Sequence, residues 1–497
     1  MSQPTRAEWE ARAKALKIEG RAFIQGEYLA SASGETFDCI SPVDGRLLAK
    51  VASCDAADAE HAVQSARATF DSGVWSREAP ATRKAVMIRF AALLEEHAEE
   101  LALLETLDMG KPIGDSLNVD LPGAADSLRW SGEAIDKVYD EVAATSHDQL
   151  GLVTREPVGV VAAIVPWNFP LMMAAWKLGP ALATGNSVIL KPSERSPLTA
   201  IRIAQLAIDA GLPAGVLNVL PGYGHTVGKA LALHMDVDTA VFTGSTRIAK
   251  QLMVYAGESN MKRVWLEAGG KSPNIVFEDA PDLQAAAEAA AAAIAFNQGE
   301  VCTAGSRLLV QKSIKAKFLP LVVEALKGWK AGHPLDPDTN VGALVDGRQL
   351  EQVLGYIQAG QDEGATILTG GKRVLEETGG TYVEPTLFDG VSNAMKIARE
   401  EIFGPVLSVI EFEDAEEAIR IANDTPYGLA AAVWTRDISK AHLTARALRA
   451  GSVWVNMYDG GDMTAPFGGF KQSGNGRDKS LHAFDKYTEL KATWIKL

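Results

Sequence analysis

Residues 160–170 read Val-Val-Ala-Ala-Ile-Val-Pro-Trp-Asn-Phe-Pro, and residues 187–194 read Ser-Val-Ile-Leu-Lys-Pro-Ser-Glu. In both stretches a short apolar run ends in a turn that contains proline. Further apolar runs occur at residues 216–220, 239–242 and 264–266, and amphipathic segments separate them. Because this alternation is typical of repeated β-α-β units, it predicts a buried parallel sheet with helices on both faces.

Outside this region the pattern predicts a second α/β segment and a helical N-terminal part. From Ser272 onward we expect an Ala-rich helix at 283–296, helices at 314–329 and 347–363, and strands at 307–310 and 453–456. The N-terminal third has helical apolar spacing at 60–70, 82–105 and 124–138. The last residues, 491–497, alternate as a strand, and both an inter-subunit strand and an ordinary edge strand fit that pattern.

The composition excludes several classes of protein. The chain has 497 residues, 47% of them hydrophobic, which is enough for a large core. Its 48 Lys and Arg against 63 Asp and Glu give a formal net charge of −15, which argues against binding to nucleic-acid phosphates. Neither a secretory signal nor a run of the ~20 apolar residues of a membrane span is evident. We therefore expect a cytoplasmic protein with neither nucleic-acid nor membrane partners.

Cysteine and histidine usage predicts no metal site. The three cysteines, Cys39, Cys54 and Cys302, form no CxxC, so neither a disulfide framework nor a thiolate zinc site is expected. No two of the eight histidines stand at i, i+4. The sequence also contains no P-loop and no GxSxG nucleophile elbow.

Two junctions between a strand and a helix are candidates for nucleotide binding. Residues 222–228, Gly-Tyr-Gly-His-Thr-Val-Gly, follow one strand but have one residue too many for GxGxxG, so a plain turn fits equally well. Residues 242–245, Phe-Thr-Gly-Ser, precede the next helix, where free N–H groups and the helix dipole favour a pyrophosphate. Two such junctions in one sheet favour a nucleotide ligand.

Five motifs carry a resemblance to a known family: Pro-Trp-Asn-Phe-Pro at 166–170, Lys-Pro-Ser-Glu at 191–194, Leu-Glu-Ala-Gly-Gly-Lys at 266–271, Asn-Gln-Gly-Glu-Val-Cys at 297–302 and Glu-Glu-Ile-Phe-Gly-Pro at 400–405. In this order and spacing the chain resembles the aldehyde dehydrogenase superfamily over nearly its whole length. The resemblance implies an α/β fold with a Rossmann-like NAD-binding domain (1–137 and 157–268), an α/β catalytic domain (269–478) and a small β oligomerisation hairpin (138–156 and 479–497). It also implies a homodimer or homotetramer.

The resemblance implies that Cys302 is the nucleophile that attacks the aldehyde. A thiolate suits this task because it is the side-chain group best able to attack a carbonyl at neutral pH. A buried structural cysteine is the alternative, and Gly299 and Gly305 beside Cys302 favour an exposed loop instead. The Asn168 amide and the Cys302 backbone N–H match the groups that stabilise the oxyanion. Glu267 matches the general base that activates water to cleave the thioester.

The implied cofactor is NAD. Lys191 and Glu194 match the pair that binds the adenosine ribose, and a carboxylate there repels a 2′-phosphate, so NADP is the weaker alternative. Glu401 and Phe403 match residues beside the nicotinamide ribose and ring. The remaining predicted cofactor residues are Val165, Trp167, Gly224, Phe242, Gly244 and Ser245. The chain departs from the family at Ala268 and Ala249, where Leu and Gly are common, and we expect local repacking only.

The implied substrate pocket is aromatic and rich in Met, which suits a long or flat apolar body. The residues assigned to it are Phe169, Met172, Met173, Trp176, Phe296, Val301, Thr303, Tyr458, Asp459 and Phe467; for any one of the apolar residues, plain core packing is the alternative. Asp120, Asp459 and Asp462 either lie near the mouth, where they suit a cationic tail, or are solvated surface residues.

Residues 456–480 resemble a bacterial branch of the family that oxidises γ-glutamyl-γ-aminobutyraldehyde and 4-guanidinobutyraldehyde in polyamine and arginine breakdown. The branch is also similar to enzymes that convert indole-3-acetaldehyde to indole-3-acetic acid, so that aldehyde and simple aliphatic aldehydes remain alternatives. Two other classes of protein are alternatives to an aldehyde dehydrogenase. A non-enzymatic relative is expected to lack Cys302 or Glu267, and a cofactor-free thiol hydrolase needs a histidine partner for its cysteine.

Overall fold

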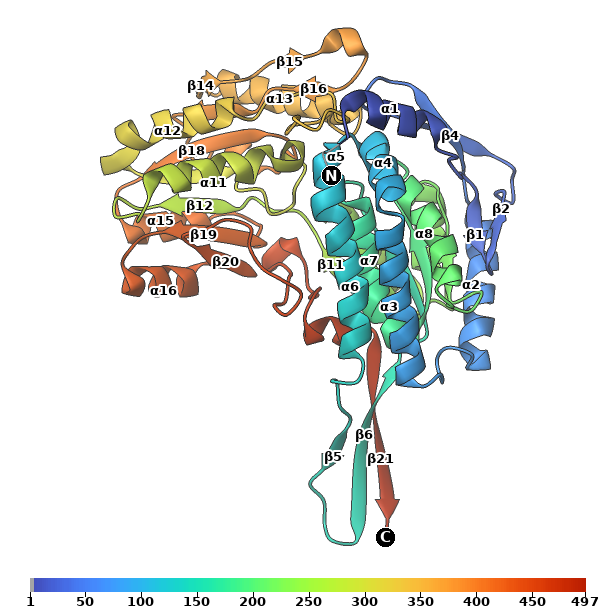
Figure 1. The fold of residues 1–497 in the computed structure, drawn as a ribbon. Helices are drawn as coiled ribbons and strands as arrows, with labels where there is room; N and C mark the ends of the chain where they lie inside the picture. The colour runs from blue at the N-terminus through green and yellow to red at the C-terminus, as the bar shows by residue number, and fades with distance from the viewer. Residues whose placement is uncertain (1–3) are drawn as a thin grey trace.

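The computed structural model describes residues 4–497, and two seven-stranded sheets dominate it (Figure 1). In spatial order the strands of the first sheet are β11 (Arg263–Glu267), β10 (Thr239–Thr243), β7 (Val160–Ile164), β8 (Ser187–Lys191), β9 (Leu217–Val219), β1 (Ala22–Ile24) and β2 (Glu27–Leu29). The first five run parallel, and β1 and β2 complete the sheet in antiparallel pairing. The parallel sheet predicted from the sequence is therefore confirmed.

The chain order of these strands reverses beside β7, because β8 and β9 extend the sheet on one side and β10 and β11 on the other. Such a switch point leaves a crevice beyond the carboxyl ends of the two central strands, and ligands bind there in open α/β sheets. The segments that follow β7 and β10 are the predicted motifs at 166–170 and 242–245. The topology alone thus marks them as candidate ligand contacts.

Helices cover both faces of the first sheet. On one side lie α3 (Pro80–Glu96), α4 (Ala98–Met109), α6 (Leu121–Ala134), α7 (Pro170–Ala183) and α8 (Leu198–Asp209); on the other lie α2 (Ala56–Ser72), α9 (Lys229–Leu233) and α10 (Thr246–Glu258). Helix α7 is buried nearly all round, and its one charged residue, Lys177, is 1% exposed. A fully buried helix with a single charge makes that charge a candidate for function.

The N-terminal part differs from the helical prediction. A short helix, α1 (Arg6–Ala15), precedes four strands. Two of them are β1 and β2, and the other two, β3 (Thr36–Ile40) and β4 (Leu47–Ala52), form a separate antiparallel pair. The single helix expected at 82–105 is two helices, α3 and α4, that meet at His97. A three-residue helix, α5 (Ile113–Asp115), and a π turn (Ser116–Asp120) lead into α6, and another π turn (Gly224–Gly228) precedes α9.

The second sheet builds the other half of the molecule. Its strands in spatial order are β14 (Thr366–Thr369), β17 (Thr386–Asp389), β18 (Val406–Phe412), β13 (Arg307–Gln311), β12 (Pro273–Val276), β19 (Ala430–Trp434) and β20 (Ser452–Val455). All neighbours run parallel except β14 and β17. Its helices are α11 (Leu283–Ala295), α12 (Lys315–Lys327), α13 (Gly347–Asp362), α14 (Lys396–Arg399), α15 (Ala415–Asn423) and α16 (Ile438–Ala447), and a separate pair is β15 (Arg373–Val374) with β16 (Tyr382–Val383).

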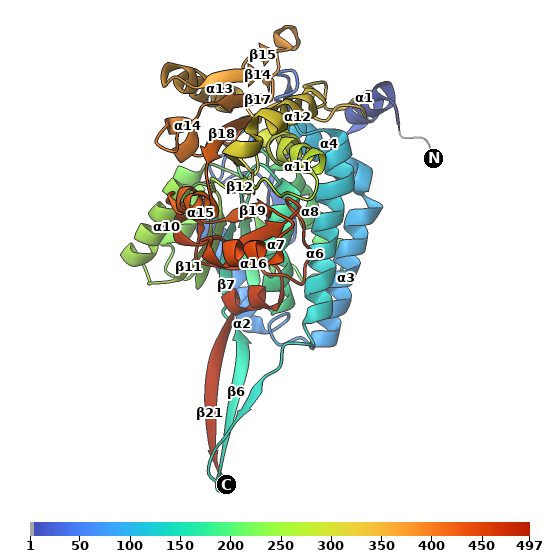
Figure 2. The same ribbon diagram turned by 90° about the vertical axis from the view of Figure 1, so that its left-hand side faces the viewer.

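A three-stranded sheet projects from the body of the molecule in both views (Figures 1 and 2). Its strands are β5 (Glu141–Ala143), β6 (Gln149–Pro157) and β21 (Thr488–Lys496), in the order β21-β6-β5. The C-terminal strand therefore finds its partner, β6, within the chain and remains an edge strand. We propose that the chain divides into the domains predicted from the sequence, with this projection (138–156 and 479–497) as the oligomerisation domain. The separate sheets support this division.

Within residues 4–497, we find no helix with both the length and the apolar character that crossing a bilayer requires.

Candidate functional site

A cleft of about 1110 Å³ runs between the carboxyl ends of the first sheet and the second sheet. Val165 and Trp167 after β7, Gly244 after β10 and Glu267 at the end of β11 line one wall. Segments near residues 296–303, 401–403 and 452–467 contribute the opposite side. The cleft therefore lies where the strand order predicts a ligand.

Cys302 lies in the cleft behind a left-handed turn of the backbone. After α11 ends, Asn297, Gln298 and Gly299 have φ values of 47°, 55° and 70°. A Cβ at Gly299 would lie 2.3 Å from the carbonyl carbon of Gly404, so only glycine fits there. Three successive left-handed residues are strained, and such strain persists where the surrounding structure enforces it, often at functional sites.

The surroundings of Cys302 disfavour its thiolate. Burial raises the pKa of the thiol well above its ordinary value, and the carboxylates of Glu401, Asp459 and Glu267 raise it further. The Thr303 backbone N–H opposes this by stabilising the thiolate. These surroundings therefore favour the thiol form of Cys302 over the thiolate.

The Asn168 side chain is fixed by hydrogen bonds to the same segment. Its Nδ2 donates to the Glu300 carbonyl at 2.8 Å, and Asn297 Nδ2 donates to the Asn168 carbonyl at 3.0 Å. Asn168 is 4% exposed and lines the cleft. An amide nitrogen carries two hydrogens, so one remains for an oxygen in the cleft.

Glu267 ends strand β11 with its carboxyl group buried. Neither carboxyl oxygen has a hydrogen-bond partner within the part of the chain that the structure describes. Burial raises the pKa of Glu267 well above its usual value, and the nearby Asp478 carboxylate raises it further, whereas the ammonium groups of Lys177 and Lys486 lower it. An unpartnered carboxyl group with a raised pKa is suited to exchanging protons near neutral pH.

A buried ion cluster near Glu267 was not found from the sequence. Asp478 is fully buried, and it pairs with Lys177 at 2.5 Å and with Lys486. These two lysines hold the pKa of Asp478 below its usual value despite its burial. The sequence held one usable signal, since Lys177 is the only charged residue in the apolar run 170–183.

The adenosine end of the predicted cofactor site has the charges that a ribose and a phosphate need. Lys191 Nζ donates to the Pro192 carbonyl at 2.7 Å and lies 3.7 Å from Glu194 Oε2. The Glu194 side chain is 36% exposed and lines the cleft, where it can accept ribose hydroxyls. Ser245 caps α10, whose N-terminus also faces the cleft with its positive dipole end.

The nicotinamide end holds the half-buried carboxyl group of Glu401. Glu401 Oε1 accepts from the Gly270 N–H at 2.9 Å, and a Cβ on Gly269 would lie 1.9 Å from Oε2. Burial raises the pKa of Glu401 to about 7. The Phe403 ring packs edge-on against Trp167 with centroids 5.1 Å apart. A polar acceptor beside aromatic rings fits a ribose joined to a planar ring, so the cleft fits a dinucleotide from end to end.

Aromatic rings line the predicted substrate end. The rings of Phe169 and Phe296 are stacked with centroids 6.2 Å apart, and those of Trp176 and Phe467 meet edge-on at 5.1 Å. Met172, Met173, Val301, Thr303 and Asp459 also line this end, and Val165, Gly224 and Phe242 line the cofactor end.

Two predicted residues lie elsewhere. Tyr458 is absent from the cleft wall; it lies behind it against Gly305 and donates to the Thr303 carbonyl at 2.6 Å. Asp120, weighed above as a mouth residue, is 1% exposed and pairs with Lys111 beneath Phe169. Both residues belong to short segments in which some side chains line the cleft and others pack behind it, and a sequence pattern does not distinguish the two kinds.

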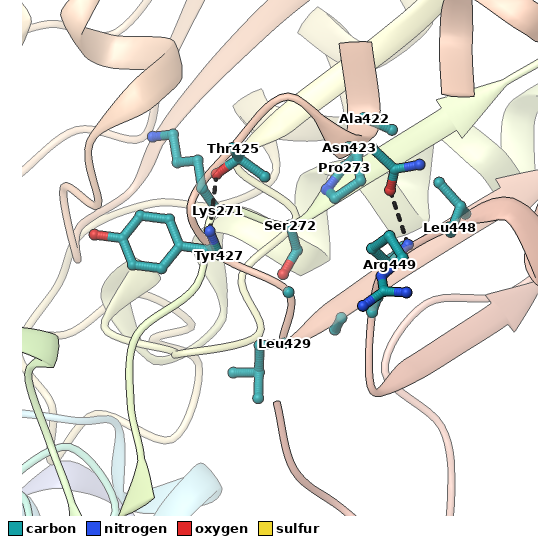
Figure 3. A pocket seen from close by; sticks show the side chains of 14 residues that line it. Lys271, Ser272, Pro273, Ala422, Asn423, Thr425, Tyr427, Leu429, Leu448 and Arg449 are labelled. Carbon is teal, nitrogen blue, oxygen red and sulfur yellow. Dashed lines mark hydrogen bonds between the residues drawn. The ribbon is translucent and has the colours of Figure 1, made fainter. Parts of the chain in front are cut away.

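Two further features exclude alternatives. The cleft wall has one histidine in the described chain, His225, and it stands next to Gly224 at the adenosine end, so Cys302 lacks the partner that a thiol hydrolase needs. A second hollow, beside Lys271, Ser272 and Tyr427 (Figure 3), has a volume of about 10 Å³. That volume admits about one water molecule and no substrate.

Comparison with known proteins gives the same result over the whole chain. The aldehyde dehydrogenase family matches residues 28–493. The AldA indole-3-acetaldehyde dehydrogenase of P. syringae, solved with NAD+ and IAA, is 83% identical with a TM-score of 0.99, and all of both chains is covered. The γ-glutamyl-γ-aminobutyraldehyde dehydrogenase of Burkholderia cenocepacia J2315 is 64% identical with a TM-score of 0.98, covering 99% of this chain and 100% of that one.

A curated relative adds information on the cofactor. The NADP/NAD-dependent aldehyde dehydrogenase PuuC of Escherichia coli (strain K12) is 58% identical over 491 residues, which are 99% of this chain and 98% of PuuC. The fold, a cleft that fits a dinucleotide and these similarities agree. The chain therefore belongs to the aldehyde dehydrogenase family and is an NAD-dependent oxidoreductase.

Proposed function

We propose that this enzyme oxidises an aldehyde with an ω-amino, γ-glutamylamino or guanidino tail to the carboxylic acid. The observation that supports this proposal best is a single cleft that joins Cys302, aromatic walls and an acidic mouth with Asp459 and Asp462. The walls suit a methylene chain, and the carboxylates attract N–H groups that carry positive charge. The similarity to a γ-glutamyl-γ-aminobutyraldehyde dehydrogenase favours the same class.

In the proposed first half-reaction, Cys302 Sγ forms a bond to the aldehyde carbon, and its proton leaves to a base in the cleft. The carbonyl oxygen becomes an oxyanion that accepts from the second Asn168 N–H and the Cys302 backbone N–H. The residues that would hold NAD are Lys191, Glu194, Ser245, Glu401 and Phe403. Bound there, NAD would supply the hydride acceptor that the oxidation requires. Once the substrate carbon has lost its hydride, its carbonyl bond forms again and the acyl group remains on Cys302 as a thioester.

In the second half-reaction Glu267 takes a proton from water, and the oxygen of that water attacks the thioester carbonyl. Collapse of the tetrahedral species expels the Cys302 thiolate and releases the acid. The buried position of Glu267 supports this role, because a carboxylate without partners in a desolvated site is a stronger base than one in water.

Indole-3-acetaldehyde is the second candidate substrate. The stacked rings of Phe169 and Phe296, together with Trp176, suit a flat aromatic body. The 83% identity to an indole-3-acetaldehyde dehydrogenase favours it as well. Simple aliphatic aldehydes would contact the aromatic walls of the cleft but not the charged residues at its mouth.

The test is a panel of kcat/KM values with NAD for γ-glutamyl-γ-aminobutyraldehyde, 4-guanidinobutyraldehyde, indole-3-acetaldehyde and butyraldehyde. The proposal predicts that a nitrogen-tailed aldehyde exceeds butyraldehyde by at least about tenfold, which corresponds to ~1.4 kcal/mol of transition-state binding. Highest kcat/KM for indole-3-acetaldehyde would support the second candidate, and equal values for all four would contradict both.

We also infer a homodimer or homotetramer in the cytoplasm. The exposed edge strand β21 is a ready template for pairing with another chain, and its Trp494 side chain is 65% exposed. The three cysteines are free of disulfide bonds, as expected in a reducing compartment.

A further inference from the structure

The mouth of the substrate end contains a cation of the protein itself. Lys479 lines the cleft, and its Nζ lies 4.7 Å from the centroid of the Trp176 ring and 6.0 Å from that of Phe467. An ammonium group at this distance is attracted to the face of an aromatic ring. A purely cationic tail that enters the mouth therefore meets a like charge as well as the two carboxylates.

Backbone hydrogen bonds hold the segment of Lys479 beside the loop that carries Asp459 and Asp462. Ser480 N–H donates to the Met463 carbonyl at 2.7 Å, and Phe467 and Asp478 exchange two N–H to carbonyl bonds at 2.7 and 2.8 Å. Lys479 and Ser480 have φ values of 57° and 50°. Two adjacent non-glycine residues in the left-handed region are strained, so the surrounding structure enforces the position of Lys479.

The acidic side of the mouth is fixed as well. Asp459 also has a left-handed φ, of 55°, between Tyr458, which is bonded to the Thr303 carbonyl, and Gly460, whose carbonyl accepts from Trp454 Nε1 at 2.6 Å. Asp462 accepts from the Thr464 N–H at 2.8 Å. Asp459 is an exposed residue of the cleft wall, and desolvation in the cleft raises the pKa of its carboxyl group while the Lys479 ammonium group lowers it.

The opposite charges lie in one mouth but do not pair with each other. Burial lowers the pKa of Lys479, and the carboxylates of Asp459, Asp462 and Asp478 oppose this effect. Within the described residues neither Asp459 nor Asp462 comes within 4.0 Å of the Lys479 ammonium group. Asp478 is buried and already held by Lys177 and Lys486. The mouth thus contains an ammonium donor and carboxylate acceptors that are not paired with each other, so both have capacity for a ligand.

We infer that Lys479, together with Asp459 and Asp462, recognises the zwitterionic head of an α-amino acid at the far end of the substrate. In a γ-glutamyl amide of an amino aldehyde, the α-carboxylate pairs with Lys479 and the α-ammonium group with Asp459 or Asp462. The aldehyde at the other end reaches Cys302 along the aromatic walls. This inference rests on the proposed function and narrows it to the γ-glutamylamino class.

Lys479→Met tests the inference because Met keeps an apolar side chain against Trp176 while removing the charge. We expect kcat/KM for γ-glutamyl-γ-aminobutyraldehyde to fall about tenfold, mainly through KM, because binding of a remote group is lost. 4-Guanidinobutyraldehyde, which has no carboxylate, should keep its kcat/KM or gain, and butyraldehyde should be unchanged. Lys479→Arg should restore the γ-glutamyl substrate.

Matched variants separate recognition from structure. Asp459→Asn and Asp462→Asn should lower kcat/KM for both charged substrates relative to butyraldehyde, whereas Lys372→Met, at an exposed lysine outside the cleft, should change none of them. An equal loss for all aldehydes in Lys479→Met, or an unchanged γ-glutamyl substrate, would overturn the inference.

A binding readout distinguishes this inference from the proposed function. γ-Glutamyl-γ-aminobutyrate, the acid product, should inhibit butyraldehyde oxidation, and Lys479→Met should weaken that inhibition about tenfold while inhibition by 4-guanidinobutyrate is kept. If the wild type shows no preference for nitrogen-tailed aldehydes, the proposed function fails, yet the shift in inhibition still reports on Lys479. Equal inhibition of wild type and variant would contradict the zwitterion site itself.

Discussion

Cys302 and Glu267 face one desolvated cleft, and the pKa of each is raised there. Burial is the first cause for both, and the negative charges of Glu401 and Asp459 add to it at Cys302. The raised pKa values favour the protonated forms of Cys302 and Glu267 relative to the same groups in water. The reactivity of both residues should therefore rise with pH.

The pH dependence can be read from alkylation of Cys302 by iodoacetamide in the protein without ligands. Only the thiolate reacts, and the pKa of Cys302 is raised, so the rate should be low at neutral pH and still climb above pH ~8.5, the ordinary thiol pKa. Cys302→Ala identifies the labelled site, since Cys39 and Cys54 are buried. A plateau of the rate below pH ~8 would contradict the raised pKa.

The choice of cofactor depends on the Glu194 carboxylate in our account. Glu194→Ser removes a charge that repels a 2′-phosphate and leaves a hydroxyl that can still bond to the ribose. We expect the NADP/NAD ratio of kcat/KM to rise by about tenfold or more. Steady-state kinetics with both cofactors measure it, and an unchanged ratio would refute the assignment of Glu194.

At the residue scale the sequence predicted the cleft well where residues sit in a motif. Cys302, Asn168, Glu267, Glu401 and Lys191 all line one cleft. The residues that could not be predicted from the sequence are those whose role depends on contacts between distant segments. Asp478 pairs with Lys486 in its own segment, but it gains Lys177, 301 residues away in the chain, only when α7 and the C-terminal segment meet, and no local sequence pattern predicts that contact.

At the element scale the left-handed turn at 297–299 controls where Cys302 lies. The turn packs directly on the segment that carries Glu401 and Phe403, because Gly299 touches Gly404. One close approach thus connects the predicted nucleophile with the nicotinamide end of the cleft. A small change in this turn should move both.

Gly299→Ala tests this element. The new Cβ would need a strained φ of 70° and would lie 2.3 Å from a backbone carbon, so the segment has to shift. A shift of about 1 Å can cost ~100-fold in rate, and we expect kcat/KM to fall by about that factor. Gly355→Ala is the control, because its helical site has nothing within 4 Å. Full activity of Gly299→Ala would show that the turn does not position Cys302.

The sheets also show which elements a sequence predicts. The apolar runs of β7, β8 and β10 are buried on both faces, so their sequences are continuously apolar and were recognised. Strands β1 and β2 have three residues each, too few for a periodic pattern. The end of α3 at His97 was also missed, because apolar spacing continues across it into α4.

At the scale of the whole molecule the projecting sheet has no core of its own. Strand β21 is largely exposed, and Leu490, Trp494 and Leu497 are 61%, 65% and 72% exposed. A strand with such apolar side chains at a free edge is stable in water when another surface covers it. This is why we infer that copies of the chain associate through it.

Removal of β21 by truncation after Tyr487 should therefore lower the molecular mass in solution to that of a smaller assembly. Sedimentation velocity measures the mass, and Trp494→Asp is a milder variant that keeps the strand. Lys330→Asp, at a residue away from the projection, serves as a surface-charge control. An unchanged assembly in both strand variants would place the subunit interface elsewhere.

In the proposed mechanism Cys302 carries the acyl group and Glu267 releases it. Rapid mixing of Glu267→Gln with NAD and γ-glutamyl-γ-aminobutyraldehyde, followed by mass spectrometry of the quenched protein, tests this directly. We predict a burst of about one NADH per active site, slow turnover afterwards, and the acyl mass on the peptide that contains Cys302. No burst together with no adduct on that peptide, or an unchanged steady rate, would contradict the account.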